Sequence, residues 1–201
     1  TCGLSETAHI HEESCYSQEC SCTQQEHTHS TECYSDETAD VETLLDWKNM
    51  FAGYPFTGNL REDLVGIAKT QVGYSESTRN FEVGSDGIRR GYTRYGAWYG
   101  TPYRDWSAAF VSFCLNYAGA DPAQTRGNIG AGTMAELWKN LGRFAPAGEY
   151  VPTAGDLVFF TNHTVGIVTE VQNTTFYVIH GDREGSVCTD AIPFGDVSIS
   201  G

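Results

Sequence analysis

Residues 107–118 read Ser-Ala-Ala-Phe-Val-Ser-Phe-Cys-Leu-Asn-Tyr-Ala, which is the most apolar stretch of this 201-residue chain. The run is longer than an ordinary buried strand, and it stops at Gly119, a residue that commonly ends helices. It therefore predicts a buried helix rather than a strand. A helix that is apolar on all sides needs other elements to cover it, so its neighbours in the sequence decide the fold class.

Weaker patterns lie on both sides of this helix. Apolar residues spaced through 41–50 predict a short amphipathic helix, and further helices are expected at about 60–72 and at 132–141. Residues 73–104 lack a clear period and are expected to form a structured loop region. Short β-branched and aromatic runs predict antiparallel strands at residues 156–160, 165–172, 175–180 and 185–192. Helices followed by strands indicate an α+β domain over residues 41–201.

Charge divides the chain into two regions. The formal net charge is -14, but residues 1–46 hold eleven of the 26 acidic residues and no Lys or Arg, so residues 47–201 are close to neutral. An acidic chain lacks the basic face that nucleic acid or an anionic membrane surface would require, so we expect neither as a partner. No run of 18 apolar residues occurs, so we expect no transmembrane segment.

The N-terminal region contains a repeat of eighteen residues with the pattern C-x6-H-x-H-x3-C-Y. Its two copies supply eight candidate metal ligands: Cys2, His9, His11, Cys15, Cys20, His27, His29 and Cys33. Two thiolates and two imidazoles in each copy are the ligand set of a tetrahedral structural zinc site. The spacing therefore predicts a two-repeat zinc module over residues 1–34, followed by a polar linker at 35–40.

Two other interpretations of the repeat stay open. Disulfides Cys2–Cys15 and Cys20–Cys33 would staple a small secreted module, although they would leave the repeated histidines without a role. A disordered acidic leader is the third interpretation, because a segment this polar cannot fold by hydrophobic burial alone. Cys22 has no counterpart in the first copy and is either an alternative ligand or a free thiol. The repeats resemble short modules in surface proteins of Gram-positive gut bacteria, which implies a secreted or cell-surface location.

Several motifs of the larger region resemble the CHAP family, the cysteine, histidine-dependent amidohydrolases/peptidases. In chain order they are Gly73-Tyr74-Ser75-Glu76 with Asn80, the segment 92–100, Asp105-Trp106-Ser107-Ala108-Ala109-Phe110-Val111-Ser112, Ala154-Gly155-Asp156-Leu157-Val158-Phe159-Phe160, and Val165-Gly166-Ile167-Val168. The resemblance covers residues 62–192. It implies a papain-like fold, with N-terminal helices packed on an antiparallel sheet, and cleavage of amide bonds in peptidoglycan stem or bridge peptides.

The positions that carry the chemistry depart from the family pattern. Ser107 occupies the position of the nucleophilic cysteine, and a hydroxyl is far less acidic than a thiol. The histidine expected directly before Val165 is replaced by Thr164, and His163 lies one residue earlier, which on a strand turns the side chain to the other face unless a bulge intervenes. The later Glu-Gly-Asn element of the family corresponds to His180-Gly181-Asp182. The candidate catalytic residues are therefore Ser107, His163, His180 and Asp182.

Three explanations compete for this altered site. A naturally altered site would leave a binding, adhesive or scaffold module with impaired hydrolysis or none. An engineered Cys-to-Ser change in an unusual amidase or endopeptidase would give the same residue at position 107. A serine hydrolase would use Ser107 with His163 or His180 and Asp182, and would need a general base and an oxyanion hole. We expect the first, a cell-envelope module directed at peptidoglycan peptides; a purely structural surface-protein domain is a further alternative.

Overall fold

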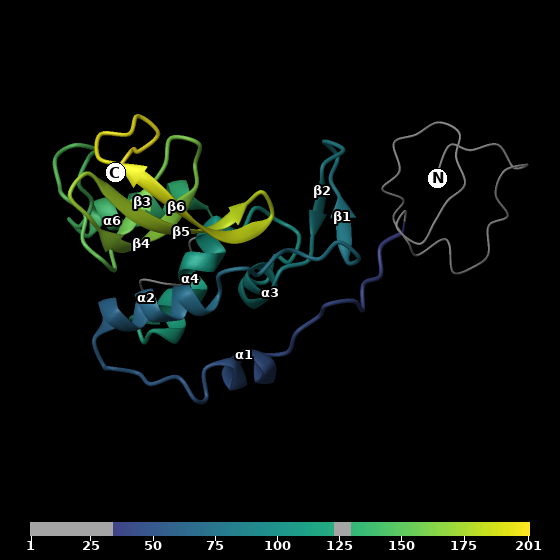
Figure 1. The fold of residues 1–201 in the computed structure, drawn as a ribbon. Helices are drawn as coiled ribbons and strands as arrows, with labels where there is room; N and C mark the ends of the chain where they lie inside the picture. Colours follow the sequence, from purple (N-terminus) through teal and green to yellow (C-terminus); the bar gives the residue numbers. More distant parts are fainter. Residues whose placement is uncertain (1–33, 123–129) are drawn as a thin grey trace, which may run out of the picture.

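The computed structural model describes residues 34–122 and 130–201, and Figure 1 shows the order of the elements in these ranges. The helices are α1 (Leu44–Met50), α2 (Leu60–Thr70), α3 (Arg94–Tyr99), α4 (Ser107–Tyr117) and α6 (Ala131–Asn140). The strands are β1 (Phe81–Val83), β2 (Arg89–Gly91), β3 (Leu157–Phe159), β4 (Val165–Val171), β5 (Thr175–Arg183) and β6 (Ser186–Pro193). The chain is thus an α+β protein, as the sequence predicted.

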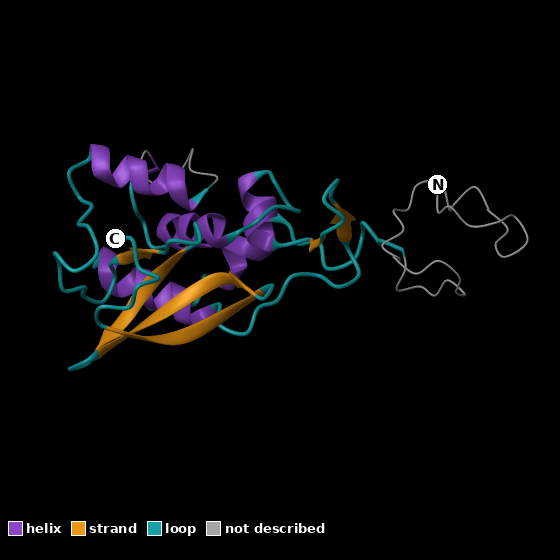
Figure 2. Ribbon diagram, turned by 90° about the horizontal axis from the view of Figure 1, so that it is seen from above, coloured by secondary structure: helices purple, strands orange, loops and turns teal. Residues whose placement is uncertain are grey.

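Strands β3 to β6 form one antiparallel sheet in the order β3-β4-β5-β6. The C-terminal residues lie along the outer edge of β3, where Ile199 is paired with Phe160 and the Gly201 carbonyl accepts the Phe159 N–H at 2.7 Å. Strands β1 and β2 form a separate two-stranded ribbon, which stands apart from the larger sheet (Figure 2). Neighbouring strands of the larger sheet are close in sequence, so tight turns connect them.

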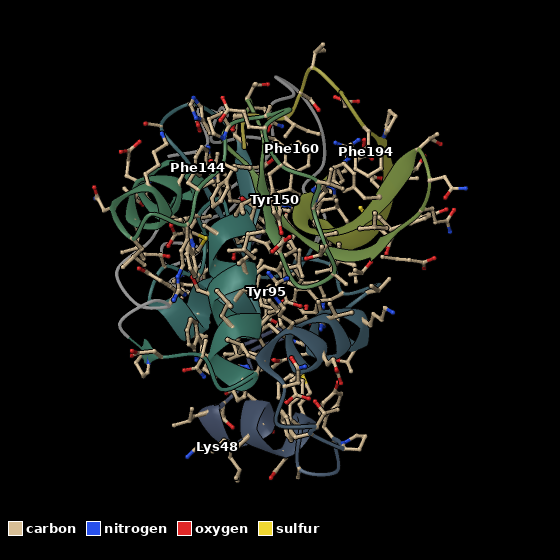
Figure 3. All side chains as sticks on the ribbon, turned by 90° about the vertical axis from the view of Figure 1, so that its left-hand side faces the viewer. Lys48, Tyr95, Phe144, Tyr150, Phe160 and Phe194 are labelled. Carbon is tan, nitrogen blue, oxygen red and sulfur yellow. The ribbon has the colours of Figure 1, made fainter. Side chains whose placement is uncertain are left out.

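Helix α4 is the centre of the main hydrophobic core. Every residue from Ser107 to Leu115 is buried, because the helix contacts β4 and β5 as well as α2, α3 and α6. Aromatic rings fill the space around it: Tyr95 stacks on Trp106 with ring centroids 5.1 Å apart, and its edge meets Phe113 at 5.2 Å. Figure 3 shows Tyr95 beside this helix, with Phe160 and Phe194 farther away by the sheet. The predicted buried helix is confirmed, with complete burial from Ser107 to Leu115, whereas Asn116 and Tyr117 are half-buried.

The larger sheet buries both of its faces. Along β5, Ile179 belongs to the main core with α4, whereas Val178 belongs to a smaller cluster on the outer face. The other buried members of this outer-face cluster are Val158, Phe160, Val168 and Phe176. Alternation of side chains along a strand assigns neighbouring residues to opposite faces, and this rule later decides where the candidate catalytic residues lie.

Most predicted elements are present with ends shifted by a few residues. The expectation for residues 73–104 was wrong, because this region contains β1, β2 and α3. These elements are only three to six residues long, too short for a periodic pattern to stand out. Helix α1 exists and begins with a capping box between Thr43 and Asp46, but it buries Trp47 and leaves Leu44 and Leu45 exposed.

Residues 35–40, which were expected to be a polar linker, lie against the β1 region. The Ser35 hydroxyl accepts the Phe81 N–H at 2.9 Å, and the Asn80 side-chain amide donates to the Ala39 carbonyl at 3.0 Å. These buried hydrogen bonds attach the segment firmly to the domain. No helix in the described part of the chain is long and apolar enough to cross a membrane.

Candidate functional site

The candidate site is built around the N-terminal end of α4. Trp106 precedes the helix and offers no side-chain cap, but its backbone N–H donates a 2.8 Å hydrogen bond to Oδ2 of Asp182 on β5. Ser107 is the first helical residue and is 6% exposed. The structure therefore brings Ser107 and Asp182, which are 75 residues apart in the sequence, to the same helix end.

Local irregularity in β5 places Asp182 there. The register of β5 with β6 shifts between His180 and Arg183, and Asp182 adopts a left-handed backbone conformation with φ of 64°. Gly181 makes the close approach possible, since a Cβ at this position would lie 2.5 Å from the Phe110 Cβ on α4. A bulge of this kind re-aims a side chain, and here it directs the Asp182 carboxyl to the backbone at the start of α4.

The carboxyl of Asp182 is held in an environment that favours its neutral form. Burial raises its pKa to about 7, and the nearby carboxylates of Asp105 and Glu76 act in the same direction. The hydrogen bond from the Trp106 N–H and the Arg90 guanidinium oppose this shift without cancelling it. Asp182 is therefore able to exchange a proton near neutral pH, a property that is common in functional sites.

Glu76, from the Gly73-Tyr74-Ser75-Glu76 motif, belongs to the same site. Its Oε2 lies 3.4 Å from Trp106 Nε1, and its backbone N–H donates to the Gly185 carbonyl at 2.9 Å. A Cβ on Gly91 or Gly185 would lie within 3.1 Å of the Glu76 side chain, so both glycines make room for it. Beside Glu76 runs an open groove of about 450 Å³, lined by Asp40, Val41, Glu42, Tyr74, Ser75, Glu76, Ser77 and Thr78.

His180 does not lie on the α4 side of the sheet. Gly181 faces Phe110 and Trp106, so His180, the preceding residue of the strand, points to the outer face. Its ring packs on Phe160 with centroids 5.0 Å apart, and its Nε2 lies 3.5 Å from Oδ2 of Asp190. Burial lowers the pKa of His180, against the opposing effect of Asp190. The imidazole is thus part of the outer-face cluster.

His163 lies in the turn between β3 and β4. Its side chain is exposed, its φ is 63°, and its backbone N–H donates to the Phe160 carbonyl at 3.1 Å. In the described ranges, no hydrogen bond joins the imidazole of His163 or His180 to the Ser107 hydroxyl. The structure brings together Ser107 and Asp182, and it places both histidines on other surfaces of the sheet.

The two cysteines of the larger domain are also accounted for. Cys114 is fully buried two turns along α4, where burial raises the pKa of its thiol well above the usual range, so it is a core residue. Cys188 is half-buried on β6, opposite His180. Burial raises its pKa too, which keeps the thiol protonated. Neither thiol is therefore disposed to ionise to a thiolate nucleophile.

The predicted zinc ligands at residues 2–33 lie outside the described residues. Within 34–122 and 130–201, no three His, Cys, Asp or Glu side chains are grouped so that they could hold a metal ion.

Sequence reasoning missed Asp105 and Arg90 as members of the site. Arg90 comes from β2, inside the region that had been expected to be a loop, and its Nε lies 3.5 Å from Asp105 Oδ1. No sequence pattern marks such a pair, because the contact depends on the ribbon that carries Arg90. The motifs quoted from the sequence did contain Glu76 and Asp105, without marking either as a site residue.

The fold and the site together define an α+β protein in which a serine and a carboxyl with a pKa of about 7 lie at the start of a buried helix. Comparison with known protein families gives no match for this chain. No curated protein and no solved structure matches it either.

Proposed function

We propose that this chain is a cell-envelope module of the CHAP type that binds peptidoglycan stem or bridge peptides and does not cleave them. The observation that carries the proposal is the set of side chains at the start of α4. The Asp182 carboxyl lies at the same helix end as Ser107, and within the described residues no imidazole is hydrogen-bonded to the Ser107 hydroxyl. A hydroxyl needs a general base to become a nucleophile. The altered residues therefore favour binding over hydrolysis.

The arrangement of the family-like motifs supports the resemblance. The Asp105–Ser112 motif spans the start of α4, and the motifs at 154–160 and 165–168 form the paired strands β3 and β4. The last motif in the chain, His180-Gly181-Asp182, lies on β5, which pairs with β4 and contacts α4. Residues of the α4, β4 and β5 motifs, which are distant in sequence, are thus neighbours in the fold, and this supports the proposal.

The open groove beside Glu76 offers a place for a peptide. Its walls carry hydroxyls, carboxylates and the ring of Tyr74, which are the group types that hold an extended polar chain. Glu76, which lines the groove, lies next to Trp106, the residue that precedes Ser107, with its Oε2 3.4 Å from Trp106 Nε1. A peptide lying in the groove would therefore contact Glu76, which neighbours the residue before Ser107.

The test combines binding and hydrolysis on the full chain. Purified peptidoglycan sacculi are incubated with the native protein, with Ser107→Cys, and with Ser112→Cys as a control for a thiol added elsewhere on α4. We expect the native protein to sediment with the sacculi and to release no new amino groups. We also expect Ser107→Cys to stay inactive, because the thiol would have no imidazole partner.

The other outcomes identify the alternatives. Release of amino groups by the native protein would show serine catalysis and contradict the proposal. Hydrolysis by Ser107→Cys, but not by Ser112→Cys, would indicate an amidase or endopeptidase frame that lacks only its nucleophile. Absence of both binding and hydrolysis would indicate a purely structural surface domain.

The N-terminal repeats are proposed to form a structural zinc module of a secreted or surface-anchored protein. The support is the repeated set of two cysteines and two histidines, which matches the tetrahedral ligand set of zinc. Metal analysis of the purified chain is expected to find bound zinc. Absence of zinc, together with two disulfides by mass spectrometry, would contradict this proposal.

A further inference from the structure

The imidazole of His180 is buried, and one of its two ring nitrogens has no hydrogen-bond partner. The side chain is 6% exposed, and its Nε2 is a buried atom without a hydrogen-bond partner. On one side lies the ring of Phe160, and on the β4 side lies Gly166, where a Cβ would be 3.4 Å from Nδ1. A buried polar atom without a partner costs free energy, so such an atom in a folded protein calls for an explanation.

The charged groups around this pocket come from β5, β6 and the turn between them. Asp190 on β6 approaches the imidazole to 3.5 Å, but its same oxygen also lies 3.3 Å from Nε of Arg183. Asp190 is thus already paired with a guanidinium. Cys188 faces His180 across the strands as a protonated thiol, and Glu184 follows Arg183 in the turn; Phe160 and Gly166, from the β3 end and β4, bring no charge.

His180 and the candidate site share one short stretch of β5. The register shift of β5 begins at His180, and the next two residues are Gly181, which packs on α4, and Asp182, which holds the Trp106 N–H. A movement of His180 out of its pocket would therefore move the backbone that positions Asp182. One backbone segment, residues 180–182, thus positions both the imidazole on the outer face and the carboxyl at the start of α4.

We propose that His180 is an acid-sensitive contact of the β5–β6 hairpin: when the imidazole gains a proton, the hairpin loosens and Asp182 leaves the start of α4. The inference rests on the proposed function, since it assigns a regulation to the same site. Mildly acidic surroundings would thereby weaken the peptide-binding end of the molecule.

The direction follows from the environment of the imidazole. Burial lowers the pKa of His180 in the folded state, so the unfolded chain binds the proton more readily. The contribution of His180 to stability is therefore fully present above pH 6.5 and is lost as the pH falls below it. An imidazole that stays neutral in the folded protein would raise the unfolding constant about tenfold between pH 7.5 and 5.5.

The experiment measures urea unfolding of the full chain at pH 7.5 and 5.5. Comparison proteins are His180→Gln, which cannot gain a proton, and His163→Gln, which removes the exposed histidine. We expect the unfolding constants of the native protein and His163→Gln to rise about tenfold more than that of His180→Gln. Hydrogen exchange of residues 176–192, corrected for its intrinsic pH dependence, is expected to accelerate at pH 5.5 in the same two proteins.

A direct titration of His180 in the native protein gives a second measurement that does not depend on the folding of a variant. The His180 ring proton of the native protein is followed by NMR, with the signal assigned from its loss in His180→Gln. A midpoint at or above pH 6.5, or an equal pH response of all three proteins, would overturn the inference. These measurements use no peptide, so they test the pH response independently of the proposed function. Failure of the sacculus-binding assay would contradict the proposed function without changing the outcome of the pH experiment.

Discussion

Asp182 and His180 are two residues apart on β5, yet they lie in opposite settings. Asp182 reaches the start of α4 and accepts a backbone N–H, whereas His180 packs on Phe160 on the outer face of the sheet. In a regular strand, residues two apart would share a face. The bulge between His180 and Arg183 separates them and gives one residue a place in the candidate site and the other a place in the outer-face cluster.

The comparison shows how one bulge gives two residues of the same strand different chemical surroundings. The burial of each group favours its neutral form, which raises the pKa of the acid and lowers that of the imidazole. A pair of groups with such shifts would suit acid–base catalysis if both faced the substrate. Because they face opposite sides of β5, the arrangement supports separate roles in binding and in pH response.

The largest expected effect comes from removing a core ring, and it compares how much the α4 side and the outer face of the sheet contribute to stability. Phe110→Ala removes a fully buried ring between α4 and β5, and it is expected to lower the free energy of unfolding by about 3–5 kcal/mol. Phe160→Ala, on the outer face and 8% exposed, is expected to cost less because its cluster is smaller. Urea unfolding at pH 7.5 measures both, and an equal or larger loss for Phe160→Ala would reverse the ranking.

Gly181→Ala tests the close approach of β5 to α4. The added methyl would lie 2.5 Å from the Phe110 Cβ and 3.0 Å from Trp106 Cζ3, so we expect a loss of about 1–3 kcal/mol. Gly132→Ala on α6 is the matched control, since nothing lies within 4 Å of its Cβ and a helical alanine stabilises by about 0.5–1 kcal/mol. Thermal unfolding compares the two, and a neutral Gly181→Ala would contradict the tight contact.

Asp182→Asn tests whether the carboxyl at the start of α4 has a raised pKa. The native carboxyl has a folded-state pKa of about 7, above its unfolded value, so its contribution to stability is present at low pH and is lost as the pH rises toward 7. The amide stays neutral, so the variant is expected to gain stability relative to the native protein between pH 4 and 7, on the order of 1–3 kcal/mol. Urea unfolding across this range measures the difference, and a constant difference would indicate that the carboxyl is not protonated near neutral pH.

Arg183→Gln should have the smallest effect. The Arg183 side chain is 57% exposed, and its ion pair with Asp190 is on the surface, so we expect a change in the free energy of unfolding of no more than about 0.5 kcal/mol. The same urea measurement at pH 7.5 applies. A loss several times larger would show that the outer face depends on its charges and not on its apolar cluster.

The strongest sequence patterns predicted the strongest elements. The apolar run at 107–118 became α4, and the β-branched runs after residue 156 became β3 to β6, because long periodic or apolar segments outweigh the effects of context. The short pieces β1, β2 and α3 were not predicted. They are held by tertiary contacts such as the hydrogen bond from the Phe81 N–H to Ser35, which no local pattern records.

The candidate site was predicted in part. The sequence named Ser107 and Asp182, and the structure places them at one helix end. It also named His163 and His180, which lie in an exposed turn and on the outer face. The displacement of His163 relative to Val165 was visible in the sequence, but the turn that exposes His163 and the bulge after His180 appear only in the structure.

The sequence by itself determined the α+β class, the central buried helix, the division between an acidic N-terminal repeat region and a nearly neutral domain, and the serine at position 107. These follow from composition and period, which act locally along the chain. Only the tertiary structure decided that Asp182 and not an imidazole lies at the start of α4, that Glu76, Asp105 and Arg90 surround it, and that His180 is buried without a hydrogen-bond partner for its Nε2. The physical reason is that proton affinity depends on burial and neighbouring charge, which exist only once distant segments have packed together.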